Sequence, residues 1–260
     1  MPYIATANRK TPALLIYLLD CSGSMNEPDI KLADGSSATR MSVALKAIED
    51  IIIRMIQLST RGTAISPRYR IGVFAYTSQV IDILGGIKSI DEVAQLGIPD
   101  LEAQNLTNTE AAFLKAEQVL QAEIPRLDPG SPAPLICHMT DGEITMGGDP
   151  SPVAERIMQM AVPDGRVLIE NIFVGPSAHL LRHPTIEAKD WSGLTSSDEL
   201  VDEYARRLFN MSSPLPDGYR TVMHEMGYRG LQAGARMMFA GNDQALLKMA
   251  FAMSSATPTR

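Results

Sequence analysis

The 260-residue chain has few cysteines and no long apolar run, and each of these shortages excludes a class of protein. Two cysteines, Cys21 and Cys137, are too few for the disulfide framework of a secreted domain. The longest apolar run, 13–19, has seven residues and ends at Asp20, whereas a membrane helix needs about 20. The N-terminus also lacks the apolar stretch of a signal peptide. We therefore expect a cytoplasmic protein with reduced thiols and no membrane partner.

Positive charge is also scarce. Lys and Arg total 23 against 30 Asp and Glu, which gives a net charge of −7. This charge disfavours binding to phosphate backbones, so no nucleic-acid partner is expected. Neither G-x-x-x-x-G-K-[ST] nor G-x-G-x-x-G occurs in the chain, so nucleotide binding has no motif to support it.

Strand-like and helix-like segments alternate along most of the sequence. Residues 41–56 repeat apolar side chains at i, i+3 and i+4, as an amphipathic helix does. The short gap between segments 71–76 and 80–84 predicts a hairpin and therefore an antiparallel edge strand. The expected strands are 13–19, 71–76, 80–84, 135–140, 167–174 and 236–240, and the expected helices are 41–56, 89–96, 109–124, 152–162, 197–211 and 242–253.

This alternation predicts a doubly wound α/β fold with a mostly parallel six-stranded sheet, one antiparallel edge strand and helices on both faces. We expect one domain over residues 12–254, with tails at 1–11 and 255–260 and a long insertion at about 175–234. Such sheets bind ligands at the carboxyl ends of their strands, where the strand order reverses. Asp20 and Asp141 both come directly after an expected strand.

The segment Asp20-Cys21-Ser22-Gly23-Ser24 follows the most apolar strand. A loop there can turn the alternating side chains of Asp20, Ser22 and Ser24 toward one point, with Gly23 giving the backbone freedom for the turn. Carboxylate and hydroxyl oxygens are the donors that Mg²⁺ or Mn²⁺ prefers. The alternative is a Ser- and Gly-rich loop that caps a helix.

This segment resembles the Asp-x-Ser-x-Ser signature of the von Willebrand factor A (vWA) family, whose members carry a metal-ion-dependent adhesion site (MIDAS). The family also takes a Thr from a second loop and an Asp from a third, and Thr107 and Asp141 follow in that order. The resemblance covers about residues 12–254 and implies a Rossmann-like vWA fold. It implies a metal site made of Asp20, Ser22, Ser24, Thr107 and Asp141.

By the same resemblance, Ser22 and Ser24 bind the metal directly and Thr107 does so directly or through water. Asp20 and Asp141 act mainly through water or through hydrogen bonds to the serines. Because the site has few direct carboxylate ligands, Mg²⁺ (or Mn²⁺) is expected and Ca²⁺ is less favoured. An Asp or Glu of a partner protein completes the coordination.

Two of these residues have an alternative interpretation. Thr107 and Glu110 have the spacing of a capping box for the next helix, and Thr109 stands close enough to take the role of Thr107. Asp141 and Gly142 are typical of a tight turn that needs no metal. The second loop also departs from the family pattern, because Asn105 and Leu106 stand where many members have glycines.

The resulting hypothesis is a non-catalytic, metal-dependent protein-binding module, an adaptor in a bacterial stress or signalling system. It is similar to stand-alone bacterial vWA proteins, including those associated with tellurium resistance, whose relatives act with protein kinases, phosphatases or AAA-type ATPases. The alternative is a Mg²⁺-dependent phosphatase or hydrolase with Asp20 as nucleophile. Phosphatases of the haloacid dehalogenase type place a second acid two residues after that Asp, and here the position is Ser22.

Overall fold

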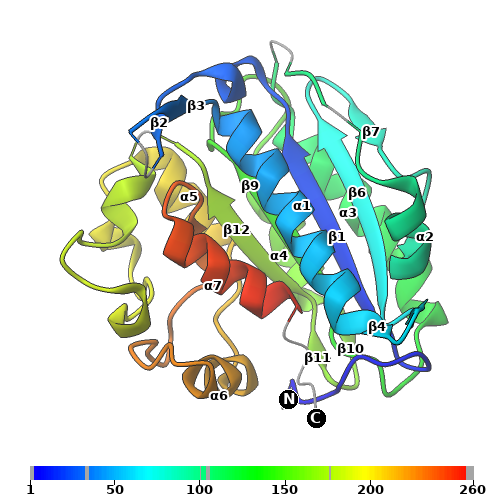
Figure 1. Ribbon diagram of the computed structural model, residues 1–260. Coiled ribbons are helices and arrows are strands. Elements are labelled where there is room, and N and C mark those ends of the chain that lie inside the picture. The colour runs from blue at the N-terminus through cyan, green and yellow to red at the C-terminus, as the bar shows by residue number, and fades with distance from the viewer. Residues whose placement is uncertain (1–2, 33–34, 100, 104–105, 176, 256–260) are drawn as a thin grey trace.

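The computed structural model describes residues 3–32, 35–99, 101–103, 106–175 and 177–255 (Figure 1). Its central strand is β1 (Ala13–Asp20), which pairs in parallel with β6 (Tyr69–Tyr76) on one side and β9 (Leu135–Thr140) on the other. Beyond β9 lie β12 (Leu168–Phe173) and β13 (Met238–Ala240), both parallel. The predicted mostly parallel sheet is confirmed.

The other edge of the sheet is antiparallel, also as predicted. The strand β7 (Val80–Asp82) returns along the carboxyl half of β6. A second short strand, β8 (Lys88–Ser89), pairs with the amino half of β6 and was not predicted. It makes the sheet seven-stranded, in the order β13-β12-β9-β1-β6-β7 with β8 beside β6.

Helices cover both faces of the sheet, which is why all eight residues of β1 are buried. One face is covered by α1 (Arg40–Ser59), α2 (Ile90–Leu96) and α7 (Gln244–Ser255). The other is covered by α3 (Thr109–Glu123), α4 (Ser151–Gln159) and α5 (Glu203–Met211). Figure 1 shows α1 and α7 in front of the sheet and α3 and α4 behind it.

The remaining elements are short. The helix α6 (Asp217–Glu225) packs against α7. Three two-stranded ribbons and five 3₁₀ helices complete the described structure: β2 (Ile30–Lys31) with β3 (Ser37–Ala38), β4 (Thr60–Arg61) with β5 (Ala64–Ile65), β10 (Ala161–Val162) with β11 (Gly165–Arg166), η1 (Gly23–Asn26), η2 (Ile124–Arg126), η3 (Ala178–Leu181), η4 (Ala188–Asp190) and η5 (Ser197–Glu199).

Three predicted helix boundaries were wrong. The helix predicted at 152–162 ends at Gln159, because the chain turns there into the β10–β11 ribbon. The helix predicted at 197–211 begins at Glu203, where the Asp202 carboxylate accepts hydrogen bonds from the first backbone N–H groups. The helix predicted at 242–253 begins at Gln244, where the Asp243 carboxylate accepts hydrogen bonds from the N–H groups of Ala245 and Leu246.

The segment before β1 is tied to the rest of the structure. The Asp164 side chain, in the turn between β10 and β11, accepts hydrogen bonds from the N–H groups of Ile4 and Ala5 at 2.8 and 2.9 Å. Ala7 is buried. Between β12 and β13, the segment 175–234 contains α5 and α6, and Arg236 just beyond it forms bridges to Leu194 and Pro214.

Candidate metal centre

The predicted site residues lie at the edge of the sheet where the strands end. From β1 the chain crosses first to β6 on one side and later to β9 on the other, so the strand order reverses between β1 and β9. Asp20 is the last residue of β1 and Asp141 directly follows β9. Both are buried, with 1% and 3% of their surface exposed.

The carboxyl group of Asp20 is held from two sides. Its Oδ1 accepts the N–H of Ser22 at 2.9 Å, and its Oδ2 accepts the hydroxyl of Thr140 at 2.6 Å. Burial, and then the neighbouring charge of Asp141, raise the pKa of Asp20 to about 7. The two acids are therefore close enough to repel each other.

The hydroxyls of Ser22 and Ser24 lie together, with their Oγ atoms 3.1 Å apart. Ser22 is the residue before η1, yet its side chain makes no capping hydrogen bond. A helix-capping role therefore does not account for the Ser22 hydroxyl. The Ser22 and Ser24 hydroxyl oxygens therefore lie next to the buried carboxyl group of Asp20.

Thr107 is completely buried and its hydroxyl oxygen has no hydrogen-bond partner in the described part of the chain. The predicted alternative, a capping box with Glu110, is wrong. Asn108 caps α3 by accepting the N–H of Ala111 at 3.0 Å, and Glu110 instead accepts the N–H of Gly148 at 2.6 Å. The hydroxyl of Thr109, the other candidate, interacts with Tyr76.

The backbone places the Thr107 loop beside the first loop. Cys21 donates its N–H to the carbonyl of Tyr76 at 2.9 Å, and Asn108 donates to the next carbonyl, that of Thr77, at 2.8 Å. The end of β6 thus holds both loops. Thr145, after β9, accepts the N–H of Thr107 at 2.8 Å, which links the second loop to the third. Asn105 lies outside the described residues, and Leu106 is exposed.

Arg40, the first residue of α1, is a part of the site that the sequence patterns did not indicate. Its Nη1 donates to Oδ2 of Asp141 at 2.8 Å, and its Nη2 and Nε bind the Asp29 carboxylate at 2.6 and 3.1 Å. The hydrogen bond from Arg40 lowers the pKa of Asp29. Arg40 and Asp141 are 101 positions apart in the sequence, which explains why no local pattern revealed the pair.

Asp141 also takes part in the turn predicted from the Asp-Gly pair. Gly142 has φ +85°, which favours glycine, and donates its N–H to the Thr140 hydroxyl at 2.9 Å. The Asp141 Oδ1 accepts the N–H of Glu143 at 3.2 Å. The turn and the ion pair with Arg40 therefore both orient this carboxylate.

The donor set fits a hard divalent cation. It offers three hydroxyls and two carboxylates. The buried Thr107 hydroxyl oxygen has no hydrogen-bond partner among the described residues, and a bound cation would give it one. Nowhere in the described residues do three or more His, Cys, Asp or Glu side chains gather as a metal site. Binding at this edge would therefore depend on the hydroxyls. Arg40 already supplies one positive charge to Asp141, so it would compete with the cation.

Behind this edge lies a buried polar network around His138, on β9. The two ring nitrogens of His138 bind the Tyr76 hydroxyl at 2.7 Å and Oδ1 of Asn171 at 2.8 Å. Burial lowers the pKa of His138 to about 4. A neutral ring then donates from Nδ1 to Asn171 and accepts from Tyr76 at Nε2.

Both cysteines are free, as predicted, and both are buried. Burial raises the pKa of the Cys21 thiol to about 12, and it raises that of Cys137 as well. Neither thiol has the lowered pKa of a nucleophilic cysteine. Every helix in the described part of the chain is too short or too polar to span a bilayer.

A family model matches about half of the chain. Residues 15–143 match the family model of the von Willebrand factor type A domain. The match begins in β1 and ends two residues after Asp141, so it includes all five predicted site residues. It supports a vWA domain, a class of domain that commonly mediates protein–protein interaction and is generally not enzymatic.

Solved structures show likeness of fold. Proximal thread matrix protein 1 from the mussel byssus has a TM-score of 0.54 at 12% identity, over 96% of this chain and 49% of its own. The chain thus spans about half the length of that protein. The SpRpn10 VWA domain has a TM-score of 0.44 at 13% identity, over 64% of this chain and 76% of its own. BatB from Bacteroides thetaiotaomicron has a TM-score of 0.40 at 17% identity, over 63% of this chain and 67% of its own. No curated protein matches the sequence significantly.

Proposed function

We propose that this protein is a non-catalytic, divalent-metal-dependent protein-binding module. Ser22, Ser24 and Thr107 would hold Mg²⁺ or Mn²⁺ through their hydroxyls, and Asp20 and Asp141 would balance its charge. The observation that carries the proposal is the Thr107 hydroxyl, which is completely buried and has no hydrogen-bond partner among the described residues. A buried hydroxyl without a partner costs about 1–3 kcal/mol, and a cation at this edge of the sheet would supply the missing partner.

The choice of donors suits recognition of an outside carboxylate. When neutral hydroxyls contact the ion and the carboxylates act mainly from farther away, the bound metal stays electrophilic toward an Asp or Glu of a partner. The chain's own residues orient this arrangement: Thr140 and the Ser22 N–H fix the Asp20 carboxylate, and Arg40 fixes that of Asp141.

The partner belongs to the proposal as well. We propose an adaptor that docks a protein kinase, phosphatase or AAA-type ATPase in the cytoplasm, as in the vWA proteins associated with tellurium resistance. The two buried free thiols suit a reducing compartment.

The alternative, a phosphatase with Asp20 as nucleophile, has less support from the geometry. Asp20 is 1% exposed and both of its carboxylate oxygens accept a hydrogen bond. An in-line attack needs an oxygen that can reach the substrate. Turnover of p-nitrophenyl phosphate that requires Mg²⁺ and is abolished by Asp20→Asn would establish the phosphatase and end the binding proposal.

Titration calorimetry tests metal binding directly. The wild-type protein should bind Mg²⁺ and Mn²⁺ with one site and bind Ca²⁺ more weakly. Ser22→Ala should abolish that heat while the circular dichroism spectrum and urea midpoint stay close to wild type, because the Ser22 hydroxyl makes no capping hydrogen bond. Ser151→Ala, at the start of α4, is the matched control and should bind as wild type does. A wild-type protein that binds none of the three ions refutes the proposal.

Capture of partners then tests the role of the metal. Immobilised wild-type protein should retain a binding partner in Mg²⁺ and release it in chelator, and Ser22→Ala should retain none. Retention that is equal in Mg²⁺ and chelator would show that binding does not use the metal.

A further inference from the structure

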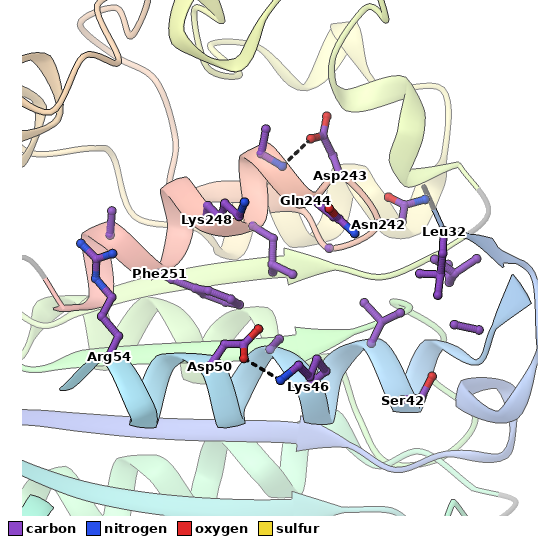
Figure 2. Close-up of a pocket in the computed structure, with 18 of the residues that line it drawn as sticks. Leu32, Ser42, Lys46, Asp50, Arg54, Asn242, Asp243, Gln244, Lys248 and Phe251 are labelled. Carbon is purple, nitrogen blue, oxygen red and sulfur yellow. Dashed lines mark hydrogen bonds and ion pairs between the residues drawn. The ribbon is translucent and has the colours of Figure 1, made fainter. Parts of the chain in front are cut away.

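A groove with a volume of about 1290 Å³ runs between α1 and α7 (Figure 2). It contains none of the five predicted metal-site residues and lies along α1 from Ser42 to Gln57, downstream of Arg40. Its other wall is formed by α7 and the residues just before it. Figure 2 shows Lys46 and Asp50 rising from α1 toward Lys248 and Gln244 on α7.

Apolar side chains from both helices line the groove. Val43 and Ile53 come from α1, and Leu247 and Phe251 from α7. Ile53 keeps 49% of its surface exposed, and Met226 at one wall keeps 44%. An apolar strip of this kind with a polar rim is typical of an interaction surface.

The rim is positively charged in a chain that is negative overall. Five cationic side chains line the groove against two acidic ones, while the whole chain has a net charge of −7. Asp50 pairs with Lys46 at 2.8 Å and Asp243 pairs with Arg182, so these four charges cancel and the lining keeps a net charge of +3. The cationic residues are Lys31, Lys46, Arg54, Arg182 and Lys248.

We propose that this groove binds an acidic amphipathic helix of a partner protein. The volume exceeds the ~300–1,000 Å³ that drug-sized ligands occupy. The wall from Ser42 to Gln57 spans 16 helical residues, which at 1.5 Å each is roughly 24 Å. That length accommodates about four turns of a helix, whose apolar residues at i, i+3, i+4 and i+7 would meet Val43, Ile53 and Phe251. Acidic residues along its flanks would face the cationic rim.

The proposal goes beyond the metal site and can fail independently of it. The probe is a fluorescein-labelled 15-residue peptide with Leu at the i, i+3, i+4 and i+7 positions and Glu on the flanking faces. Fluorescence anisotropy with the full chain should show saturable binding that weakens as NaCl is raised. The same peptide with Lys in place of Glu should bind at least about tenfold more weakly. Chelator should leave this binding unchanged.

Variants of the groove locate the binding. Lys248→Glu reverses an exposed rim charge, and Ile53→Ser removes a half-exposed apolar contact. Each should weaken the peptide roughly tenfold, about 1.4 kcal/mol, because the first change sets a negative charge against the acidic peptide and the second removes an apolar contact. Lys115→Glu on α3, on the opposite face of the sheet, and Leu58→Ser on α1, outside the groove, are the matched controls and should bind as wild type does.

Three results would overturn the proposal. One is no saturable binding of the acidic peptide. Another is equal loss of affinity in the Lys115→Glu and Leu58→Ser controls. The third is evidence for a different occupant of the groove. This would be a fatty acid, if laurate binds and the peptide does not, or a second copy of the chain, if the wild type self-associates in ultracentrifugation and Lys248→Glu does not.

Discussion

Thr107 is positioned by its backbone while its hydroxyl has nothing to bind among the described residues. A side chain with a structural role would lose stability on removal of its hydroxyl, but here the hydroxyl is a cost to the metal-free fold. We therefore predict that Thr107→Val raises the free energy of unfolding in chelator by about 1 kcal/mol. The same change should weaken Mg²⁺ binding at least tenfold, about 1.4 kcal/mol. Urea unfolding and calorimetry measure the two effects.

Ser131→Ala is the matched control for this variant, because Ser131 is also completely buried with an unpartnered hydroxyl. It should raise stability similarly and leave metal affinity unchanged. A Thr107→Val protein that is less stable than wild type in chelator would contradict the functional interpretation of this hydroxyl.

Arg40 neutralises Asp141 in the metal-free protein. Removal of one partner of a buried ion pair leaves the other charge uncompensated, at a cost of about 3–5 kcal/mol. We predict that Arg40→Met lowers stability in chelator by roughly that amount and tightens Mg²⁺ binding by roughly tenfold, because a competing positive charge is removed. Thermal unfolding with and without Mg²⁺ measures both effects.

Asp29→Asn is the control for Arg40, because it removes the outer partner and leaves the Arg40–Asp141 pair in place. It should not tighten metal binding. Weaker Mg²⁺ binding in Arg40→Met would show that Arg40 holds Asp141 in position for the cation and does not compete with it.

At the scale of elements, the regular segments were predictable and the irregular ones were not. The continuous apolar run of β1 and the helical period of α1 are local signals, and both elements were found where expected. The helix predicted at 89–96 was likewise found, as α2, and it begins with a capping box of Ser89 and Glu92. The helix α6 was missed because glycines dot the sequence around it, and its packing against α7 is a tertiary contact that no local pattern reports.

The cap at the start of α3 lies next to a residue of the candidate metal site. Asn108 caps α3 directly after Thr107, whereas Asp202 caps α5 in the segment between β12 and β13. Loss of either cap should lower the free energy of unfolding by about 1 kcal/mol. We predict that Asn108→Ala also weakens Mg²⁺ binding severalfold, since it loosens the loop that holds Thr107, and that Asp202→Ala does not. Equal metal affinity in the two variants would show that the α3 cap does not position the site.

At the scale of the molecule, the positions of Asp20 and Asp141 were predictable because parallel strands end at the same edge of a sheet. The register that sets Tyr17 opposite Cys137 brings the ends of β1 and β9 together. The Arg40–Asp141 pair was not predictable, because it depends on how the first turn of α1 meets that edge. The charge state of the site is thus a property of the folded chain, whereas its donor set can be found in the sequence.

Glu170 makes the stability of the fold depend on pH. It is completely buried on β12 beside Cys137, whose thiol interacts with its carboxyl group, and burial raises its pKa to about 8. The unfolded chain releases this proton near its ordinary value of 4.5, while the folded chain keeps it until about pH 8. Stability should therefore fall as pH rises through this window.

We predict that Glu170→Gln, which keeps the side chain neutral, makes the protein more stable than wild type at pH 8 by roughly 4 kcal/mol. The difference should shrink to under about 1 kcal/mol near pH 5, which is close to the value of 4.5 at which the unfolded chain takes up the proton. Urea unfolding at pH 5, 6.5 and 8 measures it, with the exposed Glu155→Gln as control. Since each variant is compared with wild type at the same pH, the titration of His138 cancels from the difference. A stability difference that stays constant across these pH values would show that Glu170 is ionised inside the folded protein, and the interior at β12 would then have to supply it a partner.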